Sequence, residues 1–464
     1  MDINPSIFKA YDIRGKVPAE ITEAVALQIG RSAAAYFIKK ARKPHPAILL
    51  CRDVRASSES LAAALAEGIR SQGADVLDGG VSTTPFFYFL IHTTKLDGAV
   101  MVTASHNPPE YNGFKIRDSK GGAVSLGSGL ERIRDHAMRF RDKPSGRTKA
   151  QGKTGALPDM RDAYIDTLAK GAGIGKIKIV LDAAGGSTTL FLPKLLSRFP
   201  SVSARTLFFE TDGTFRRHDP NPLLPQAQQF AQKELRKGGY RFGAVFDGDG
   251  DRVNFFDEKG NLVNPEFVFL LSALAELEAR PKSVFALPVD TSRIVEREIR
   301  AHGGSVAWCR RGYTFVKKAM QESGAALGVE RSGHFFFKSF SYDDSALLAW
   351  VRLAGLISRA RKPFSSLIKP YVQSAVSGEA SLPLKDGKTE VLLAGVRDYY
   401  KKAGARLSFL DGVKVEFPDW WVNVRPSNTE PLVRVALEAK TKKLFRQKLK
   451  EIGSIIERKK ATVG

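Results

Sequence analysis

The feature that most constrains the fold is a β-α-β order that recurs along the chain. Residues 47–77 contain a short apolar run, a segment with helical spacing and a second run of strand character. Residues 178–209 repeat this order, and in both segments the two strand candidates are 27 positions apart. A third copy begins near residue 284. Because strands that alternate with helices are typical of parallel sheets, we expect a series of similar α/β units and not a solenoid.

Length and loop composition suggest where the domains end. At roughly 150 residues per domain, a chain of 464 residues has room for about three large domains. Prolines or glycines mark possible linkers at residues 141–158 and 363–370. Residues 420–437 then suggest two strands joined by a loop, and a basic helix closes the chain. We therefore predict three similar mixed α/β domains and a smaller C-terminal α+β domain, at residues 1–150, 151–256, 257–367 and 368–464.

Composition excludes several classes of protein. The longest apolar stretch, residues 267–275, is far shorter than the ~20 residues of a membrane span, and the first residues show no secretory signal. Two cysteines, Cys51 and Cys309, cannot form a disulfide framework or a four-ligand zinc site, so we expect a cytoplasmic protein. Lysine and arginine number 72 against 49 aspartates and glutamates, a formal charge of +23 that indicates anionic partners without choosing among them.

An acidic loop carries the clearest chemical signal. Asp247, Asp249 and Asp251 alternate with glycines directly after an apolar run. Glycine permits tight turns, so three short acids can converge on one hard cation such as Mg²⁺. An EF-hand is excluded because Arg252 stands where that loop needs glycine. The remaining alternative is a solvated acidic turn.

A serine loop follows the strand candidate at residues 98–102. Ser105 could act as a nucleophile at the edge of the sheet, where α/β proteins place their ligands. His106 is adjacent in sequence and is therefore not automatically its base. The chain has no G-x-S-x-G elbow, which argues against an α/β-hydrolase. A capped turn with an ordinary serine is the alternative.

Two further loops offer groups for sugar and phosphate. The loop after residue 424 brings together a guanidinium, hydroxyls and an amide, which are phosphate ligands, unless it is only a hairpin connection. Its candidates are Arg425, Ser427, Asn428 and Thr429. In the other loop, Glu330 and Ser332 could bind a polyol and His334 could move a proton, although a lone histidine is more often structural.

Taken in order, these loops resemble those of the α-D-phosphohexomutase family, most closely its bacterial phosphomannomutase/phosphoglucomutase branch. The opening residues 8–15 and residues 111–115 are similar to the same branch, so the resemblance covers essentially the whole chain. It implies four domains around a central cleft, with one functional loop from each. The implied reaction is a reversible phosphoryl shift between the 1 and 6 positions of mannose or glucose, through a hexose 1,6-bisphosphate. A monomer or weak dimer is expected.

The resemblance also implies a role for each candidate residue. Ser105 would carry a phosphoryl group and, with Asp247, Asp249 and Asp251, hold one Mg²⁺ per chain. Arg14, Lys115 and His334 would transfer protons or stabilise charge, and Arg252 would support the metal loop. Tyr11, Glu330 and Ser332 would contact the sugar. The phosphate that does not react would be held by Arg425, Ser427, Asn428 and Thr429.

Two positions depart from the family pattern and leave the preferred sugar open. Asp290 stands where close members have a lysine, and Tyr313 stands where some have a histidine; Arg310 and Arg311 could compensate. A phosphoglucosamine mutase is one alternative. The other is a nucleic-acid-binding protein that keeps the fold, although the amphipathic pattern of residues 440–460 favours a surface helix instead. If the bisphosphate intermediate must reverse its orientation within the cleft, the cleft has to loosen, and we expect hinge motion of the last domain near residues 363–370.

Overall fold

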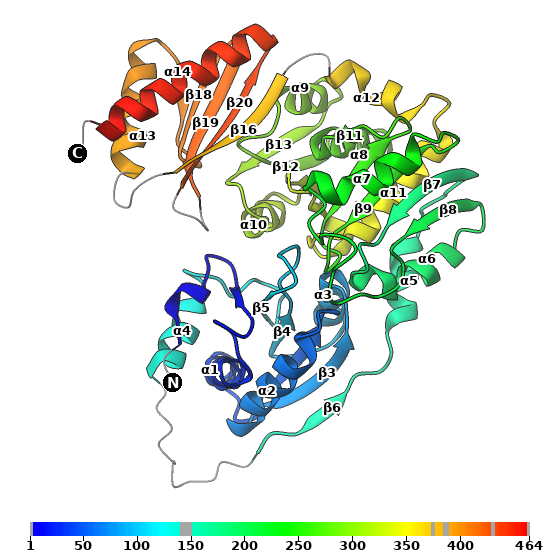
Figure 1. The fold of residues 1–464 in the computed structure, drawn as a ribbon, viewed down its shortest axis with the longest axis vertical. Helices are drawn as coiled ribbons and strands as arrows, with labels where there is room; N and C mark the ends of the chain where they lie inside the picture. Colours follow the sequence, from blue (N-terminus) through cyan, green and yellow to red (C-terminus); the bar gives the residue numbers. More distant parts are fainter. Residues whose placement is uncertain (1–2, 140–150, 373–375, 384–388, 428–431, 462–464) are drawn as a thin grey trace. The chain divides into compact units, whose positions relative to one another are not determined.

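A computed structural model describes residues 3–139, 151–372, 376–383, 389–427 and 432–461. The chain forms two compact units. The first comprises Met1–Val263, Ser332–His334 and Asp343–Arg361, and the second comprises Asn264–Arg331, Phe335–Tyr342 and Lys362–Gly464. Each unit contains two β-sheets (Figure 1). Among the described residues, no helix combines the length and the apolar character that crossing a membrane requires.

The first sheet has six strands in the order β1-β5-β4-β2-β3-β6. They are β1 (Ile13–Lys16), β2 (Ala47–Arg52), β3 (Asp75–Val81), β4 (Gly98–Val102), β5 (Tyr111–Asp118) and β6 (Thr154–Ala156). The helices are α1 (Glu23–Ala41), α2 (Ser58–Ser71), α3 (Thr84–Thr93) and α4 (Leu130–Arg139). Figure 1 shows α1 and α2 side by side. Leu61, Leu65 and Ile69 lie four residues apart on α2, so they share one face and enter the core between helices and sheet.

The second sheet has the order β11-β10-β9-β7-β8. Its strands are β7 (Ile177–Asp182), β8 (Val202–Leu207), β9 (Phe242–Phe246), β10 (Val253–Asp257) and β11 (Leu262–Val263). It is accompanied by α5 (Arg161–Ala169), α6 (Leu192–Ser197), α7 (Pro225–Leu235) and α11 (Ala346–Arg359). β9 is buried along its whole length, which explains its uninterrupted apolar sequence.

The second unit contains the other two sheets. The third sheet has the order β13-β12-β14-β15. Its strands are β12 (Val284–Pro288), β13 (Ser305–Cys309), β14 (Leu327–Val329) and β15 (Phe335–Phe337). Its helices are α8 (Pro265–Ala279), α9 (Arg293–Ala301), α10 (Tyr313–Ser323) and α12 (Phe364–Val372). The fourth sheet is antiparallel, in the order β16-β20-β19-β18-β17. Its strands are β16 (Val376–Pro383), β17 (Arg406–Ser408), β18 (Val413–Phe417), β19 (Trp420–Pro426) and β20 (Leu432–Ala439). The helices α13 (Thr389–Lys402) and α14 (Lys442–Ala461) lie against this sheet.

The first three sheets share one topology, as the repeated sequence pattern predicts. In each, two parallel strands are joined through a helix, a third parallel strand pairs with the first of them, and a fourth returns antiparallel. The turn between the third and fourth strands contains residues 103–110 in the first sheet, 247–252 in the second and 330–334 in the third. Three of the predicted functional loops therefore occupy the same topological position. The predicted fold class of three α/β domains and one α+β domain is confirmed.

Secondary structure occurs within the ranges expected to be linkers and across two expected boundaries, and the domain boundaries themselves stay a prediction. Strand β6 pairs with β3, so the first sheet extends beyond residue 150 into the predicted linker. Strand β11 likewise carries the second sheet beyond residue 256. Helix α11 packs on α5 and β10 of the first unit, although it falls within the range predicted for the third domain. Residues 364–372 form α12, where a linker was expected, because Phe364 and Ile368 are buried. The hinge stays a prediction.

The basic C-terminal segment is an amphipathic helix, as predicted. Ile452, Ile455 and Ile456 of α14 are buried in the core of the fourth sheet. Their burial accounts for the apolar residues between the lysines. This face of the helix is therefore structural.

Candidate active site

Ser105 lies in the serine loop, residues 103–110, at the carboxyl end of β4. Its φ of 52° is left-handed, which costs a residue other than glycine roughly 1–3 kcal/mol. The Ser105 N–H donates to Thr103 Oγ1 at 2.9 Å. Its hydroxyl donates to Asp247 Oδ2 at 3.1 Å and lies 3.1 Å from His106 Nδ1. The strained backbone thus presents the hydroxyl to the acidic loop of the next domain.

The aspartate loop, residues 247–252, is held largely by its own backbone. Asp247 Oδ1 accepts hydrogen bonds from the N–H groups of Gly250 at 2.9 Å and Arg252 at 3.1 Å. Gly250 has a φ of 77°, a conformation that a side chain would disfavour. The alternating glycines therefore allow the chain to turn around Asp247.

The amino end of α3 meets the same loop. Thr84, the first residue of this helix, donates from Oγ1 to Asp249 Oδ2 at 2.6 Å and from its N–H to the Asp249 carbonyl at 2.8 Å. A helix amino terminus favours nearby negative charge. The first domain thus stabilises a carboxylate of the second.

The three carboxylates fit a divalent cation. Asp247, Asp249 and Asp251 are all buried, and each places a carboxylate oxygen within 4.8 Å of the others. Oδ1 of Asp249 and Oδ1 of Asp251 are buried without a hydrogen-bond partner. Oxygen ligands of this type suit Mg²⁺, and a cation would satisfy both atoms. The cluster could therefore hold a metal ion.

Lys115 is the protein's own counter-charge to this cluster. It lies on β5, and its Nζ donates to Asp249 Oδ2 at 2.8 Å and Asp251 Oδ2 at 2.6 Å. Two like charges 4 Å apart repel by about 4 kcal/mol at an effective dielectric constant of about 20. Burial and the neighbouring carboxylates raise the pKa of Asp247 well above its ordinary value. Burial alone would lower the pKa of Lys115, but Asp249 and Asp251 raise it well above its ordinary value, which favours the charged form of Lys115.

Arg14 and His106 complete the surroundings of the serine loop. Arg14, on β1, donates from Nη1 to Asn107 Oδ1 at 2.7 Å and from Nη2 to Asp12 Oδ2 at 2.5 Å. Burial, with the positive charges of Arg252 and Arg14, lowers the pKa of His106 well below its ordinary value. Because the one proton of the Ser105 hydroxyl goes to Asp247, the Nδ1 of His106 is the donor to Ser105 Oγ in this arrangement.

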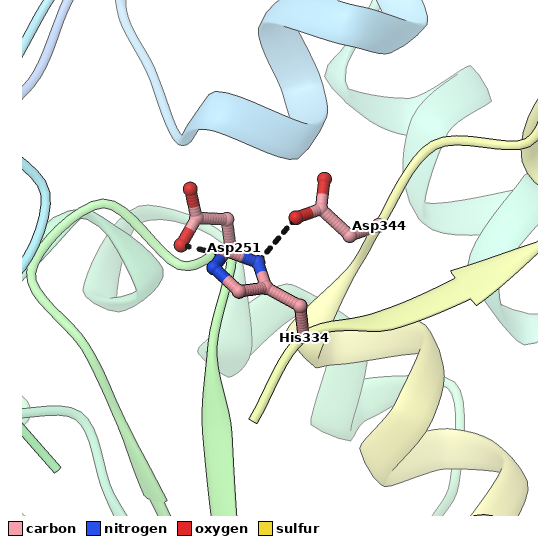
Figure 2. A group of neighbouring side chains, drawn as sticks. All are labelled: Asp251, His334 and Asp344. Carbon is pink, nitrogen blue, oxygen red and sulfur yellow. Dashed lines mark hydrogen bonds and ion pairs between the residues drawn. The ribbon is translucent and has the colours of Figure 1, made fainter. Parts of the chain in front are cut away.

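Figure 2 shows the imidazole of His334 between the carboxylates of Asp251 and Asp344. Its Nδ1 makes a short hydrogen bond to Asp344 Oδ2 and lies 3.8 Å from Asp251 Oδ1. Arg252 donates from Nε to His334 Nε2 at 2.8 Å. Because a guanidinium can only donate, Nε2 must accept, which places the imidazole proton on Nδ1. Asp251, His334 and Asp344 form a second cluster that could hold a metal, but its ring nitrogen and adjacent guanidinium suit Mg²⁺ less well than three carboxylates do.

The remaining predicted residues are divided between the two units. Tyr11 and Ser332 lie in the first unit and are partly buried, whereas Glu330 and Arg425 lie in the second and are each 6% exposed. Arg425 Nε lies 3.9 Å from Asp411 Oδ2. The side chain of Ser427 is partly buried, and its N–H donates to the Leu432 carbonyl. Asn428 and Thr429 lie outside the described residues.

The two departures from the family pattern have structural partners. Arg311 Nη1 lies 3.1 Å from Asp290 Oδ2 and 2.5 Å from Glu379 Oε2. Burial alone would raise the pKa of Asp290, but Arg311 and other arginines lower it. Compensation for the missing lysine by Arg310 and Arg311 stays a prediction. Tyr313 begins α10 and packs against a small apolar cluster.

Sequence reasoning missed several residues of the site. Arg55, Thr84 and Asp344 approach the serine loop, the aspartate loop and His334 from elsewhere in the chain. Arg55 and Thr84 each follow a parallel strand of the first sheet, β2 and β3. Polar residues at the carboxyl ends of parallel strands are the signal that could have identified these two.

Comparison with known proteins identifies the family. Models of phosphoglucomutase/phosphomannomutase α/β/α domains I, II and III match residues 5–138, 162–260 and 264–374, and the model of the C-terminal domain matches residues 379–452. The chain is 34% identical over 441 residues to a phosphohexose mutase of Xanthomonas campestris, covering 93% of this chain and 95% of that one. It is 33% identical to a phosphomannomutase of Salmonella typhimurium, over 93% and 94% of the two chains.

A comparison with solved structures gives the same family. A phosphoglucomutase/phosphomannomutase family protein from Burkholderia thailandensis superimposes with a TM-score of 0.87 at 30% identity, covering 99% of this chain and 98% of that one. Fold and comparisons define a mutase, an enzyme of the isomerase class that acts on hexose phosphates. The chain belongs to the phosphoglucomutase/phosphomannomutase family.

Proposed function

We propose that this mutase moves a phosphoryl group reversibly between the 1 and 6 positions of mannose or glucose through Ser105. The observation that carries the proposal is the buried hydrogen bond from the Ser105 hydroxyl to Asp247, beside two further carboxylates and Lys115. Phosphoryl transfer depends on positioning and charge neutralisation more than on a strong nucleophile. Three carboxylates that could hold a cation, together with Lys115, supply the positioning and the charge neutralisation that phosphoryl transfer requires.

The proposed reaction has two balanced steps. Phospho-Ser105 gives its phosphoryl group to the free hydroxyl of the sugar phosphate, so a bond from phosphorus to Ser105 Oγ breaks and one to the sugar oxygen forms. The hydroxyl proton passes to Nε2 of neutral His334, which otherwise accepts from Arg252. The resulting hexose 1,6-bisphosphate reverses its orientation in the site. In the second step the bond from its other phosphorus to the sugar oxygen breaks, a bond to Ser105 Oγ forms, and the sugar oxygen takes the proton back from His334 Nε2. Lys115 and Arg14 stabilise the transferring charge.

Mg²⁺ is the proposed cofactor, one per chain, held by Asp247, Asp249 and Asp251 and by an oxygen on Ser105. When bound, it neutralises charge on the transferring group. Activation by the bisphosphate is part of the same proposal.

Substrate recognition is assigned to the other loops. We propose that Tyr11, Glu330 and Ser332 contact the sugar, and that the phosphate at rest is bound by Arg425, Ser427, Asn428 and Thr429. The burial of Glu330 and Arg425 supports a recognition role, because buried charges call for a partner. We further propose a cytoplasmic enzyme that is a monomer or a weak dimer.

Intact-mass measurement tests the central step. The purified enzyme, treated with glucose 1,6-bisphosphate, should carry the mass of one phosphoryl group. Ser105→Ala should lose that mass and the mutase activity, whereas Ser272→Ala on α8 should keep both. Activity in Ser105→Ala equal to wild type, or no phosphate on the wild-type enzyme, would refute the route.

A substrate panel tests the preference. Mannose 1-phosphate and glucose 1-phosphate should have higher kcat/KM than glucosamine 1-phosphate. The reverse order would favour a phosphoglucosamine mutase.

A further inference from the structure

Arg55 is a buried cation close to Ser105, and its role is not evident from its place in the sequence. It lies between β2 and α2, and its side chain is 0% exposed. Its guanidinium donates to four backbone carbonyls, those of Ser105 at 2.7 Å, Asn107 at 2.6 Å, Pro108 at 2.8 Å and Tyr111 at 3.1 Å. Arg55 therefore contacts the serine loop along its length.

The guanidinium is itself fixed on its other sides. Arg55 Nε lies 3.3 Å from Asp53 Oδ2. The other oxygen of Asp53 accepts from the Ser58 hydroxyl at 2.5 Å and from the Arg55 N–H at 3.0 Å, which orients the carboxylate. The ring of Phe215 covers the guanidinium, with its centroid 5.1 Å from Arg55 Cζ. Asp53 and Phe215 therefore fix the guanidinium in the position from which it donates to the serine loop.

The contacts explain why the position needs arginine. A guanidinium presents its donors in one rigid plane, so it can reach several carbonyls at once. The three donors of a lysine lie on one nitrogen and cannot match four carbonyls spread over residues 105–111. Lysine would keep the charge opposite Asp53 and lose most of the loop contacts.

We infer that Arg55 is a positioning residue that holds the serine loop in the conformation required for phosphoryl transfer. The inference rests on the proposed role of Ser105. Ser105 has a left-handed backbone that its neighbours must impose, and its carbonyl accepts directly from Arg55. Without these bonds the loop relaxes, and the hydroxyl leaves its place beside Asp247. The hydrogen bonds of the Arg55 guanidinium go to backbone carbonyls, and not to the Ser105 hydroxyl or to the carboxylates of the aspartate loop.

The test compares Arg55→Lys with Arg241→Lys. Arg241 also donates to two backbone carbonyls, those of Ile357 and Ala360, and it serves as a matched control outside the site. Arg55→Lys should lower kcat about a hundredfold and leave KM for the sugar phosphate within about twofold. Amide exchange of the peptide that contains residues 103–111 should become about tenfold faster. Arg241→Lys should change neither quantity.

A second variant covers the case in which Arg55→Lys does not fold. Arg55→Gln combined with Asp53→Asn removes both buried charges, so no unpaired ion remains, and it should show the same losses. Unchanged exchange and unchanged kcat in a folded variant would overturn the inference.

The outcomes separate this inference from the function on which it rests. If the wild-type enzyme carries no phosphate and Ser105→Ala stays active, the proposed function fails and takes the inference with it. If wild type is phosphorylated on Ser105 but exchange in Arg55→Lys equals that in Arg241→Lys, the inference alone fails.

Discussion

The serine loop and the aspartate loop occupy the same topological position, yet they are held in different ways. The aspartate loop turns around one of its own side chains, Asp247, which accepts two N–H groups of the same loop. The serine loop has its backbone held from outside, by Arg55. The side chain that closes the turn of the aspartate loop therefore lies within its own motif, whereas the arginine that holds the backbone of the serine loop lies 50 positions earlier in the chain.

The largest effect should follow from metal removal, because it leaves three buried carboxylates close together, two of them bonded to Lys115. Chelation with EDTA should lower mutase activity about a thousandfold, and Mg²⁺ should restore it. Asp249→Asn should require much more Mg²⁺ for the same recovery in a coupled assay. Asp257→Asn is the control, since Asp257 is buried but caps a turn. Full activity after chelation would contradict the proposed metal role.

Gly248→Ala should break the contact between the two loops. A Cβ at this position would lie 2.7 Å from the Ser105 carbonyl oxygen and 3.2 Å from the Phe215 ring. Either the serine loop or the aspartate loop must then move. We expect kcat to fall about a hundredfold, with a lower Tm.

The control for Gly248→Ala is Gly175→Ala. At Gly175 the nearest atoms, of Ser358, lie at the ordinary distance of 3.7 Å. This variant should keep both kcat and Tm. Equal behaviour of the two variants would show that the loops tolerate displacement.

Asp344→Asn should have a moderate effect through His334. The amide cannot supply the negative charge that the Nδ1–H faces, so the imidazole loses its fixed tautomer. We expect kcat to fall about tenfold, with KM unchanged. Asp343→Asn breaks a similar pair with His92 and should leave kcat near that of wild type. An equal loss in both variants would indicate general destabilisation.

The smallest expected effect concerns His218, which pairs with Asp182 at the end of β7. Burial lowers the pKa of His218, but the Asp182 carboxylate, 3.3 Å from Nε2, raises it above its ordinary value overall. A raised pKa in the folded state means that the pair stabilises fully below the ordinary pKa of about 6.5 and less as pH rises through the folded value.

Thermal unfolding of His218→Gln measures this contribution. The difference in Tm from wild type should be greatest near pH 6 and should shrink toward alkaline pH. A difference that grows with pH would contradict the assignment. The result bears on the aspartate loop because Asp182 holds a neighbouring segment. Asp182 Oδ1 accepts from the Ala184 N–H, and this segment leads to Gly186, which packs against Gly248 of the aspartate loop.

The sequence predicted the architecture because its two signals, the apolar run of a buried strand and the helical spacing of apolar residues, each lie within one short segment. An apolar run such as residues 242–246 must be buried on both faces, and a segment such as α2 shows its apolar face every three to four residues. The boundaries were less accurate. Strand β6 belongs to a sheet only through pairing with β3, a partner far away in the sequence.

The sequence alone indicated the chemistry that we propose for this protein, because Ser105, three glycine-spaced acids and a basic loop lie in contiguous motifs. The tertiary structure decided which groups make those motifs work. Arg55 lies 50 positions before Ser105, and Thr84 lies 165 positions before Asp249. Asp344 is close to His334 in sequence, but only the fold aims its carboxylate at Nδ1. A hydrogen bond depends on distance and direction in space, and neither is written in the spacing of residues along a chain.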